Sequence, residues 1–431
     1  MWCRFFYFYG TFVSFIFLSI LGESNVYKKS LDLKRCLELG LENSLTLKQL
    51  EIEISSFGLE IKKEKATLRP SLSSEASVGI KHHHLNKKKD YDLSSLSFNL
   101  DYPLYDNGQS FIKENLLLRR KKKLELKLVQ EKNKIISEIT FLFLDISLEE
   151  TFLKSSQEEF VFAERNFKVL SQQYQEGLKS YSDYLTGKAN LQRKKVQLES
   201  LKFSLSQKKN SFFSLLNKDS FSLEIFSLES LKVPIWPSSL DFSSFIEIKI
   251  EQLETQNSQD QIILSEKKTF PELALSFGGK YNTQDFFKTS HSWQENQAWE
   301  WSALFTVKYP LWDWNKSAYD VEIMTEKKRS QEYQEKKILE KIKNESEKLR
   351  LQFEENLQLL KLAKELWDLE KQRADSIKIS YQNGKSPLSD WLLVEKEKLE
   401  AEGRYLAALI SLQKNYYSLL QLQGNLHEIL L

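Results

Sequence analysis

The chain has 431 residues, of which 28% are charged, and its formal net charge is +2 at pH 7. A net charge this close to zero gives no polyelectrolyte signal, so no nucleic-acid partner is implied. With only 13 glycines and 7 prolines, the composition favours long amphipathic helices. The two cysteines, Cys3 and Cys36, form neither a disulfide framework nor a zinc-binding spacing.

The N-terminus has the organisation of a secretory signal peptide. Arg4 precedes an apolar run over residues 5–21, and small residues follow at Gly22 and Ser24. We predict a signal peptide over residues 1–24 and export of the remaining chain. Because the run is slightly long, an uncleaved membrane anchor is the alternative. No later segment reaches the roughly 18 uninterrupted apolar residues that suggest a transmembrane helix.

Two segments contain neither proline nor glycine over unusually long distances. The first lies between Gly108 and Gly177, and the second covers residues 311–383. Proline inside a helix costs about 3 kcal/mol and glycine about 1 kcal/mol, so their absence predicts helices. Apolar residues at three- and four-residue spacing support this prediction. At 1.5 Å per residue each helix would be about 100 Å long and would need partners along its length.

Each long helix is followed by a short break and a second helix, predicted over residues 188–216 and 388–423. The breaks contain Gly177 and Gly384, which suit the left-handed residue just past a helix end. The pattern therefore predicts two long helical hairpins, each with a sharp tip.

The residues after each break supply helix-start signals. Ser180 and Asp183 form an S-x-x-D capping box. In the second break, Ser386 is a candidate N-cap with Pro387 at the first helical position.

Two pairs of strands with period-two alternation precede the hairpins. Apolar residues alternate with polar ones over residues 72–81, 95–102, 272–281 and 299–309, and only Leu304 interrupts the last series. Strands of about ten residues with aromatic residues near their ends match transmembrane β-strands. Each pair lies directly before a long helix, at the joints marked by Pro103 and Pro310.

The two halves of the chain are a sequence repeat. The segment Tyr102–Asp106 reads Y-P-L-Y-D and reappears as Y-P-L-W-D at Tyr309–Asp313, an offset of 207 residues. The Y-x-x-G pattern and the S-D-aromatic-L pattern of the two tips keep the same offset. We assign residues 25–232 to the first repeat, 233–240 to a connector and 241–431 to the second repeat.

The strand count predicts an oligomer. Sheet edges are not tolerated in lipid, and the smallest transmembrane barrels need about eight strands, so four strands cannot suffice. Three copies would give twelve strands around one passage. The fold class predicted is an α+β membrane protein, in which a duplicated strand pair and long helical hairpin assemble as a trimeric twelve-stranded β-barrel with a periplasmic α-helical tunnel.

Together these motifs resemble the TolC-like outer membrane efflux protein family. The resemblance rests on the duplicated Y-P-L-aromatic-D joints, the Y-x-x-G tips and a helix-forming stretch over residues 37–45, and it covers nearly all of residues 31–425. It implies a homotrimer in the outer membrane of a two-membrane bacterium, with a long periplasmic extension. It also implies that a periplasmic adaptor protein connects the trimer to an inner-membrane pump, so that the chain is a passive duct for efflux or type I secretion.

Two departures from the family pattern accompany the resemblance. The first joint has Asn107-Gly108 after the aspartate, as in the family, whereas the second has Trp314-Asn315 without glycine. The Asn-Pro that is common in the family's opening helix is replaced by Asn43-Ser44.

The resemblance assigns adaptor binding to the hairpin tips. The residues in the matching positions are Gly177, Leu178, Ser180, Gly384 and Lys385. The alternative is that these residues only form the helix-to-helix turn, which requires glycine in any case.

The resemblance also places a constriction just beyond the second tip. There Asp390 would project one carboxylate per subunit into the bore, and Tyr381 and Asp183 match positions whose contacts hold relatives closed. The arginine and second aspartate usual in the family are Ser386 and Leu393 here, which would hold the gate more loosely or by hydrophobic contact. Alternatively, Asp183 and Asp390 only stabilise helix N-termini.

Other candidate sites are weak. His82-His83-His84 lies in a predicted strand-to-strand loop without carboxylate or thiolate partners, so no metal site is expected. Lys87-Lys88-Lys89 beside it is a candidate for contact with outer-membrane lipid. No catalytic constellation or phosphate-binding loop occurs, so neither an enzyme nor a cofactor is predicted. The main alternative function is a structural coiled-coil scaffold of the cell envelope, which would explain the helices but not the strands.

Overall fold

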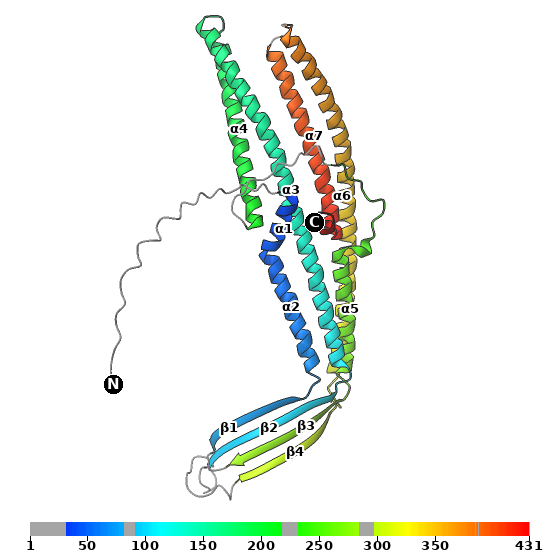
Figure 1. Cartoon of the computed structure of the whole chain (residues 1–431). Helices are drawn as coiled ribbons and strands as arrows, with labels where there is room; N and C mark the ends of the chain where they lie inside the picture. Colours follow the sequence, from blue (N-terminus) through cyan, green and yellow to red (C-terminus); the bar gives the residue numbers. More distant parts are fainter. Residues whose placement is uncertain are drawn as a thin grey trace, which may run out of the picture.

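The computed structural model describes residues 32–81, 91–217, 232–283, 297–383, 385–386 and 388–430. The predicted signal peptide and the strand-to-strand loop with His82–His84 and Lys87–Lys89 lie outside these ranges. A sheet occupies one end of the molecule, and long helices extend from it to two separate tips at the other end (Figure 1).

The described part of the first half of the chain contains four helices and two strands. These are α1 (Leu33–Asn43), α2 (Leu45–Ala66), β1 (Ser71–Lys81), β2 (Tyr91–Tyr105), α3 (Gln109–Gln175) and α4 (Tyr181–Leu216). Ser44, at the Asn-Ser departure from the family pattern, ends α1 with an extended backbone, and its hydroxyl caps α2 by accepting from the backbone N of Leu47. The second helix of the hairpin starts at Tyr181, seven residues earlier than the predicted range of 188–216, because the capping box already begins it.

The second half repeats the order of a helix, two strands, a long helix and a shorter helix, without a helix equivalent to α1 among its described residues. It contains α5 (Ile246–Lys267), β3 (Glu272–Thr283), β4 (Gln297–Lys308), α6 (Lys316–Gln382) and α7 (Leu388–Gln423), followed by the short α8 (Leu426–Leu430). The connector predicted at 233–240 has no regular structure, and Trp236 within it packs against Phe353 of α6 with ring centroids 5.2 Å apart.

The helices confirm the register of the repeat. Helices α3 and α6 both have 67 residues, and α4 and α7 both have 36. Their starting residues, Gln109 with Lys316 and Tyr181 with Leu388, keep the offset of the repeated sequence motifs. Helices α2 and α5 both have 22 residues, but their starts at Leu45 and Ile246 are closer together than that offset. The extra residues of the second repeat therefore fall between these helices and the long ones, in the strand region.

The four strands form one antiparallel sheet in the order β1-β2-β3-β4. The pairing of β2 with β3 joins the two repeats into one sheet, a contact that the sequence pattern alone did not predict. In the described part of one chain, β1 and β4 each have a neighbouring strand on one side only.

The strand register sorts the side chains onto two unlike faces. One row across the sheet is apolar and contains Leu72, Leu100, Phe277 and Ala303. The adjacent row on the opposite face contains Ser71, Asp101, Ser276 and Leu304, so the residue that interrupts the alternation lies on the polar face. In that row the hydroxyl of Ser276 donates to Oδ1 of Asp101 at 2.7 Å.

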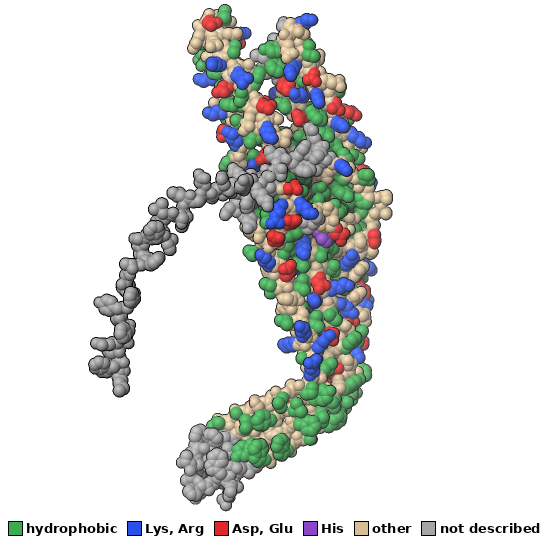
Figure 2. Space-filling view, viewed as in Figure 1, with side chains coloured by type: hydrophobic (Ala, Val, Ile, Leu, Met, Phe, Trp, Pro, Cys, Tyr) green, Lys and Arg blue, Asp and Glu red, His purple; other side chains and the backbone are tan. Residues whose placement is uncertain are grey.

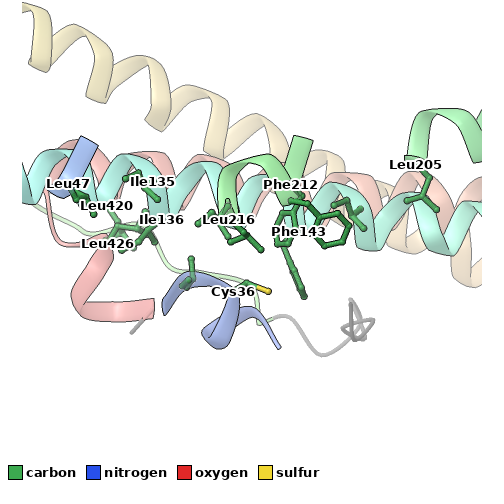
Figure 3. Close-up of a cluster of buried hydrophobic side chains, with 14 residues drawn as sticks. Cys36, Leu47, Ile135, Ile136, Phe143, Leu205, Phe212, Leu216, Leu420 and Leu426 are labelled. Atoms are coloured by element: carbon green, nitrogen blue, oxygen red, sulfur yellow. The ribbon is translucent and has the colours of Figure 1, made fainter. Parts of the chain in front are cut away.

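The main hydrophobic core lies midway along the helices, where α1, the start of α2, α3, α4, α7 and α8 meet (Figure 3). Phe212, Leu216, Ile136 and Ile139 are fully buried there, together with the thiol-bearing Cys36. Burial raises the pKa of Cys36 to about 12, which leaves it inert as a nucleophile.

No helix in the described ranges is both long and apolar enough to cross a bilayer. On the face visible in Figure 2, hydrophobic side chains gather over the sheet, whereas lysine, arginine, aspartate and glutamate intermix over the helices.

Candidate functional site

The first strand-to-helix joint is organised by Asp106. Its Oδ1 accepts from the backbone N of Gly108 at 3.0 Å, and its Oδ2 accepts from the backbone N of Ser110 at 2.7 Å. Asn107 and Gly108 both adopt the left-handed conformation, with φ of 54° and 75°. These two left-handed residues, together with the capped start of α3, turn the chain sharply from the strand into the helix.

The ionisation of Asp106 reflects its capping role. Partial burial acts to raise the pKa of this carboxyl group, but the hydrogen bonds from the side chain and backbone of Ser110 and from Gly108 outweigh it. The net effect is a pKa below the usual value, so the carboxylate remains ionised and keeps capping the helix. This residue was part of the repeated motif, but its role as a cap was not predicted.

The second joint reproduces this geometry without glycine. Trp314 and Asn315 have φ of 54° and 61°, and Oδ2 of Asp313 accepts from the backbone N of Ser317 at 2.9 Å. Asparagine tolerates the left-handed region better than other residues with a side chain, so Asn315 replaces glycine at this position. Pro103 lies in β2 at a register shift in the pairing with β3, and Pro310 lies in the segment between β4 and α6.

Aromatic side chains surround the two joints. Tyr105, Tyr309, Trp312 and Trp314 are all at least half exposed in one chain. Amphipathic aromatic rings concentrate where a transmembrane barrel meets the water interface. The joints therefore have the composition of the periplasmic edge of a membrane-embedded sheet.

The tip of the first hairpin is a tight helix-to-helix turn. Gly177 has φ of 75°, and the backbone N of Leu178 donates to the carbonyl of Gln173 at 2.8 Å, which ends α3 in a Schellman motif. The predicted capping box is confirmed, because Asp183 N donates to Ser180 Oγ at 3.1 Å while Ser180 N donates to Asp183 Oδ2 at 3.2 Å. Hydrogen bonds from the hydroxyl and backbone of Ser180 lower the pKa of Asp183.

The second tip has the same closing hydrogen bond. The backbone N of Lys385 donates to the carbonyl of Ser380 at 2.8 Å, the counterpart of the Leu178–Gln173 bond in the first repeat. Gly384 and Pro387 lie outside the described residues, and α7 begins at Leu388. The predicted N-cap role of Ser386 stays a prediction.

The predicted gate residues are distributed over both tips. Asp390 and Leu393 lie exposed on the first turns of α7, while Asp183 lies on the other hairpin as a helix cap. Tyr381 stacks on Trp391 with ring centroids 5.2 Å apart and planes 15° apart. Among the described contacts of one chain, no hydrogen bond joins Tyr381 to Asp183.

Trp391 connects the two hairpins, a role that the sequence pattern did not predict. Its ring meets Phe162 of α3 edge-on, with centroids 5.9 Å apart, while its other neighbour Tyr381 belongs to its own hairpin. The equivalent residue in the first hairpin, Tyr184, stacks on Tyr174. The repeated aromatic in the S-D-aromatic-L motif was the signal that could have identified this contact.

A groove of about 480 Å³ lies between the hairpins beside Trp391. Phe162, Leu393 and Leu399 supply apolar walls, and Lys194, paired with Glu159, lies at its polar side. No group of three or more His, Cys, Asp or Glu side chains that could hold a metal ion occurs within the described ranges.

Comparison with known proteins identifies the family. A sequence profile described as outer membrane efflux protein matches residues 36–218 and 247–425, which are most of the two repeats. The chain belongs to this outer membrane efflux protein family. A comparison with curated protein sequences found no significant match.

Solved channels of this kind share the fold. The structure matches that of CusC, whose folding and transmembrane channel formation are accompanied by conformational changes. The TM-score is 0.76 at 13% identity, and the match covers 92% of each chain. It also matches the open state of the MtrE outer membrane channel of Neisseria gonorrhoeae, with a TM-score of 0.76 at 14% identity, over 91% of this chain and 89% of the other. The CmeC outer membrane channel of Campylobacter jejuni matches with a TM-score of 0.71 at 16% identity, over 91% and 86%.

Family and fold together establish the general function. The chain is an outer-membrane exit duct with a helical periplasmic extension, as the sequence predicted. The alternative of a coiled-coil envelope scaffold is not favoured, since the family and the matched structures are channels.

Proposed function

We propose that three copies of this chain form one duct through which an inner-membrane pump expels its cargo. The observation that carries the proposal is the sheet, which has one apolar face and one polar face. Each of its two edge strands, β1 and β4, pairs with a neighbouring strand on one side only. Joining β4 of one copy to β1 of the next removes every edge, as lipid requires. Twelve strands then place the apolar rows toward lipid and the polar rows toward the passage.

The hairpin tips are the proposed docking region for a periplasmic adaptor. Both tips are tight turns at which Leu178 and Lys385 are exposed. Because the helices continue directly from the strands, the tips lie at the end of the molecule farthest from the outer membrane (Figure 1). The duct itself is passive, and the pump selects the cargo.

The purified full-length protein tests the duct proposal. In detergent it should have the mass of three chains and a β-signal beside the helical one. In planar bilayers it should conduct ions. A monomeric, non-conducting helical rod would contradict the proposal and would favour the alternative, a coiled-coil scaffold of the cell envelope.

We propose that Asp390 forms part of the constriction at the periplasmic end. Three like charges in a narrow bore attract cations and disfavour one another's ionisation. The substitution Asp390→Ala is expected to raise the single-channel conductance and reduce cation selectivity. Asp375→Ala removes an exposed aspartate elsewhere on the second hairpin and is the matched control. Unchanged conductance and selectivity in Asp390→Ala would mean that Asp390 only stabilises the start of α7.

We propose that the first tip contacts the adaptor, and Gly177→Phe tests this contact. No atom lies within 4 Å of a Cβ at Gly177, so the added ring would project into the docking surface rather than into the hairpin. A clash of about 1.4 kcal/mol lowers affinity about tenfold. Recovery of the adaptor after cross-linking in the native host should fall about tenfold, with the trimer intact.

Gly177→Ala is the control for the tip, because alanine brings the same backbone strain at φ of 75° but adds little bulk. Normal adaptor recovery with Gly177→Phe would contradict a contact at this tip. Loss with both variants would indicate that the backbone of the turn, rather than its surface, is required.

A further inference from the structure

The two hairpins of one chain are held together unequally along their length. Midway along the helices the contact between α3 and α7 is closely packed, because Leu144 clusters with Leu406 and Ile410. Closer to the tips, Phe152 lies directly against Gly403, where an added Cβ would be 2.4 Å from Cε1 of the ring. Toward the tips themselves the two hairpins diverge (Figure 1).

In the diverging part, Trp391 of α7 meets Phe162 of α3 edge-on, with ring centroids 5.9 Å apart. Phe162 lies ten residues beyond Phe152 along α3, which is about 15 Å closer to the tip. The groove of about 480 Å³ lies directly beside the two rings, between α3, α4 and α7. The hairpins therefore meet here through an incompletely filled interface, in contrast to the close packing at Phe152.

A difference between the repeats explains why Trp391 reaches the other hairpin. Its equivalent in the first hairpin, Tyr184, contacts Phe167 of its own hairpin with centroids 5.5 Å apart. The residue equivalent to Phe167 in the second hairpin is Ala374, which is buried but has no ring. The larger indole of Trp391 contacts Phe162 of the first hairpin instead.

Two opposing contributions act on Trp391 in this position, with its ring on Phe162. The edge-on contact with Phe162 and the stack on Tyr381 are favourable. Its Nε1 is buried, however, and has no hydrogen-bond partner among the described residues. A buried donor without an acceptor is unfavourable, so the indole is held in place only marginally.

The groove offers the indole a second position. Pockets of about 300 Å³ already accept ring-containing ligands, so this groove can accept the indole ring. Its polar lining includes Glu158, Asn166 and Asn190, whose side-chain oxygens can accept from an N–H group. An indole that moved into the groove would lose its contact with Phe162 and gain an acceptor for Nε1.

We propose that the Phe162–Trp391 contact is a latch that sets the spacing of the two hairpins near their tips. With the indole on Phe162 the latch is closed, and with the indole in the groove it is released. Below it, Phe152 and Gly403 keep the hairpins together in both states. Two discrete arrangements of one side chain, close in free energy, are what a conformational switch requires.

The latch acts on the proposed constriction, and the inference rests on the trimeric duct proposed above. Asp390 directly precedes Trp391 on α7, so the carboxylate moves with the start of that helix. Three copies place six hairpins in a ring around the passage. Because a wider spacing between the hairpins of each chain lengthens the circumference of that ring, release of the latch widens the passage.

Planar-bilayer recordings of the purified full-length trimer test the latch, with each variant compared at an equal amount of heat-resistant trimer. Trp391→Ala removes the ring contact, so the fraction of time at the larger conductance level should rise at least threefold. Phe162→Ala removes the other half of the same contact and should have the same effect. The double variant should resemble either single variant, because one contact can be lost only once.

Trp391→Phe separates the contribution of the ring from that of the N–H group. Phenylalanine keeps a ring against Phe162 and Tyr381 but leaves no donor unsatisfied, so the closed latch is stabilised. The fraction of time at the larger conductance level should therefore fall at least threefold.

Trp367→Ala is the matched control. Trp367 stacks on Tyr405 of its own hairpin with centroids 5.2 Å apart, and its described ring contacts do not reach the other hairpin. Its removal costs the second hairpin an aromatic stack without affecting the latch, so the recordings should be unchanged.

Four results would overturn the inference. The first is Trp391→Ala behaving like Trp367→Ala, and the second is a lower open fraction in Trp391→Ala, which would mean that the ring holds the hairpins apart. The third is independent effects of Phe162→Ala and Trp391→Ala that multiply in the double variant. The fourth is Trp391→Phe opening as often as the parent or more.

The same recordings separate the latch from the duct and the constriction. A parent protein that does not conduct contradicts both the duct and the latch. If Asp390→Ala changes the conductance while the Trp391 variants do not, the latch alone is overturned. If the Trp391 variants respond as expected while Asp390→Ala does not, the latch is supported and the constriction lies at other residues.

Discussion

The Phe277→Arg substitution is expected to remove most of the assembled protein from the outer membrane. Phe277 lies in the middle of β3, on the apolar row with Leu100 and Ala303. An arginine on the lipid face at the membrane midplane costs about 2–4 kcal/mol, and each copy of the trimer would bear this cost. The measurement is the amount of heat-resistant trimer in outer-membrane fractions.

The neighbouring residue provides the matched control. Ser276 lies on the opposite face, where its hydroxyl already donates to Asp101. Ser276→Arg would place its guanidinium group beside that carboxylate in a polar passage, so normal trimer levels are expected. Equal losses from both substitutions would contradict the assignment of the two faces, because the same side chain would then be tolerated on neither.

The Asn133→Asp substitution is expected to cause the largest loss of stability in the helical part. Asn133 of α3 is fully buried, and its Nδ2 donates to the carbonyls of Val129 at 3.0 Å and Gly424 at 2.7 Å. Its Oδ1 accepts from the backbone N of His427 at 2.8 Å, which docks α8 onto α3. A carboxylate would face two carbonyl oxygens, and an uncompensated buried charge costs about 3–5 kcal/mol.

The temperature at which the detergent-solubilised trimer dissociates measures this loss. Burial would raise the pKa of the new carboxyl group above its value in the unfolded chain. The group's contribution to the free energy of unfolding is therefore most favourable below the unfolded-state pKa and is lost as pH rises through the folded-state pKa. The deficit should therefore shrink in acid. His427→Ala removes only a ring contact of 3.2 Å to Asn133 and leaves the backbone bond, so it should cost no more than about 1 kcal/mol. A deficit independent of pH would argue against a charge effect in Asn133→Asp.

Local patterns predicted the elements of this fold because each pattern has a local physical cause. The absence of proline and glycine predicted α3 and α6, since either residue is costly inside a helix. The capping box at Ser180 and Asp183 was predictable because both partners lie within one turn. The roles of Trp391 and Asn133 were not, since their partners Phe162 and Gly424 lie in the opposite half of the sequence.

The amino-acid sequence by itself determined the elements, their duplication at one fixed offset, and the alternation that gives each strand an apolar side. These properties follow from backbone preferences and from periodicity along one segment. Only the tertiary structure decided that β2 pairs with β3, that the hairpins meet through α3 and α7, and which apolar residues of one chain remain exposed. Those choices depend on packing between distant segments, where many pairings satisfy the same local pattern and shape complementarity selects one. The sequence therefore determines each helix and strand of the duct locally, whereas packing between distant segments determines how these elements assemble.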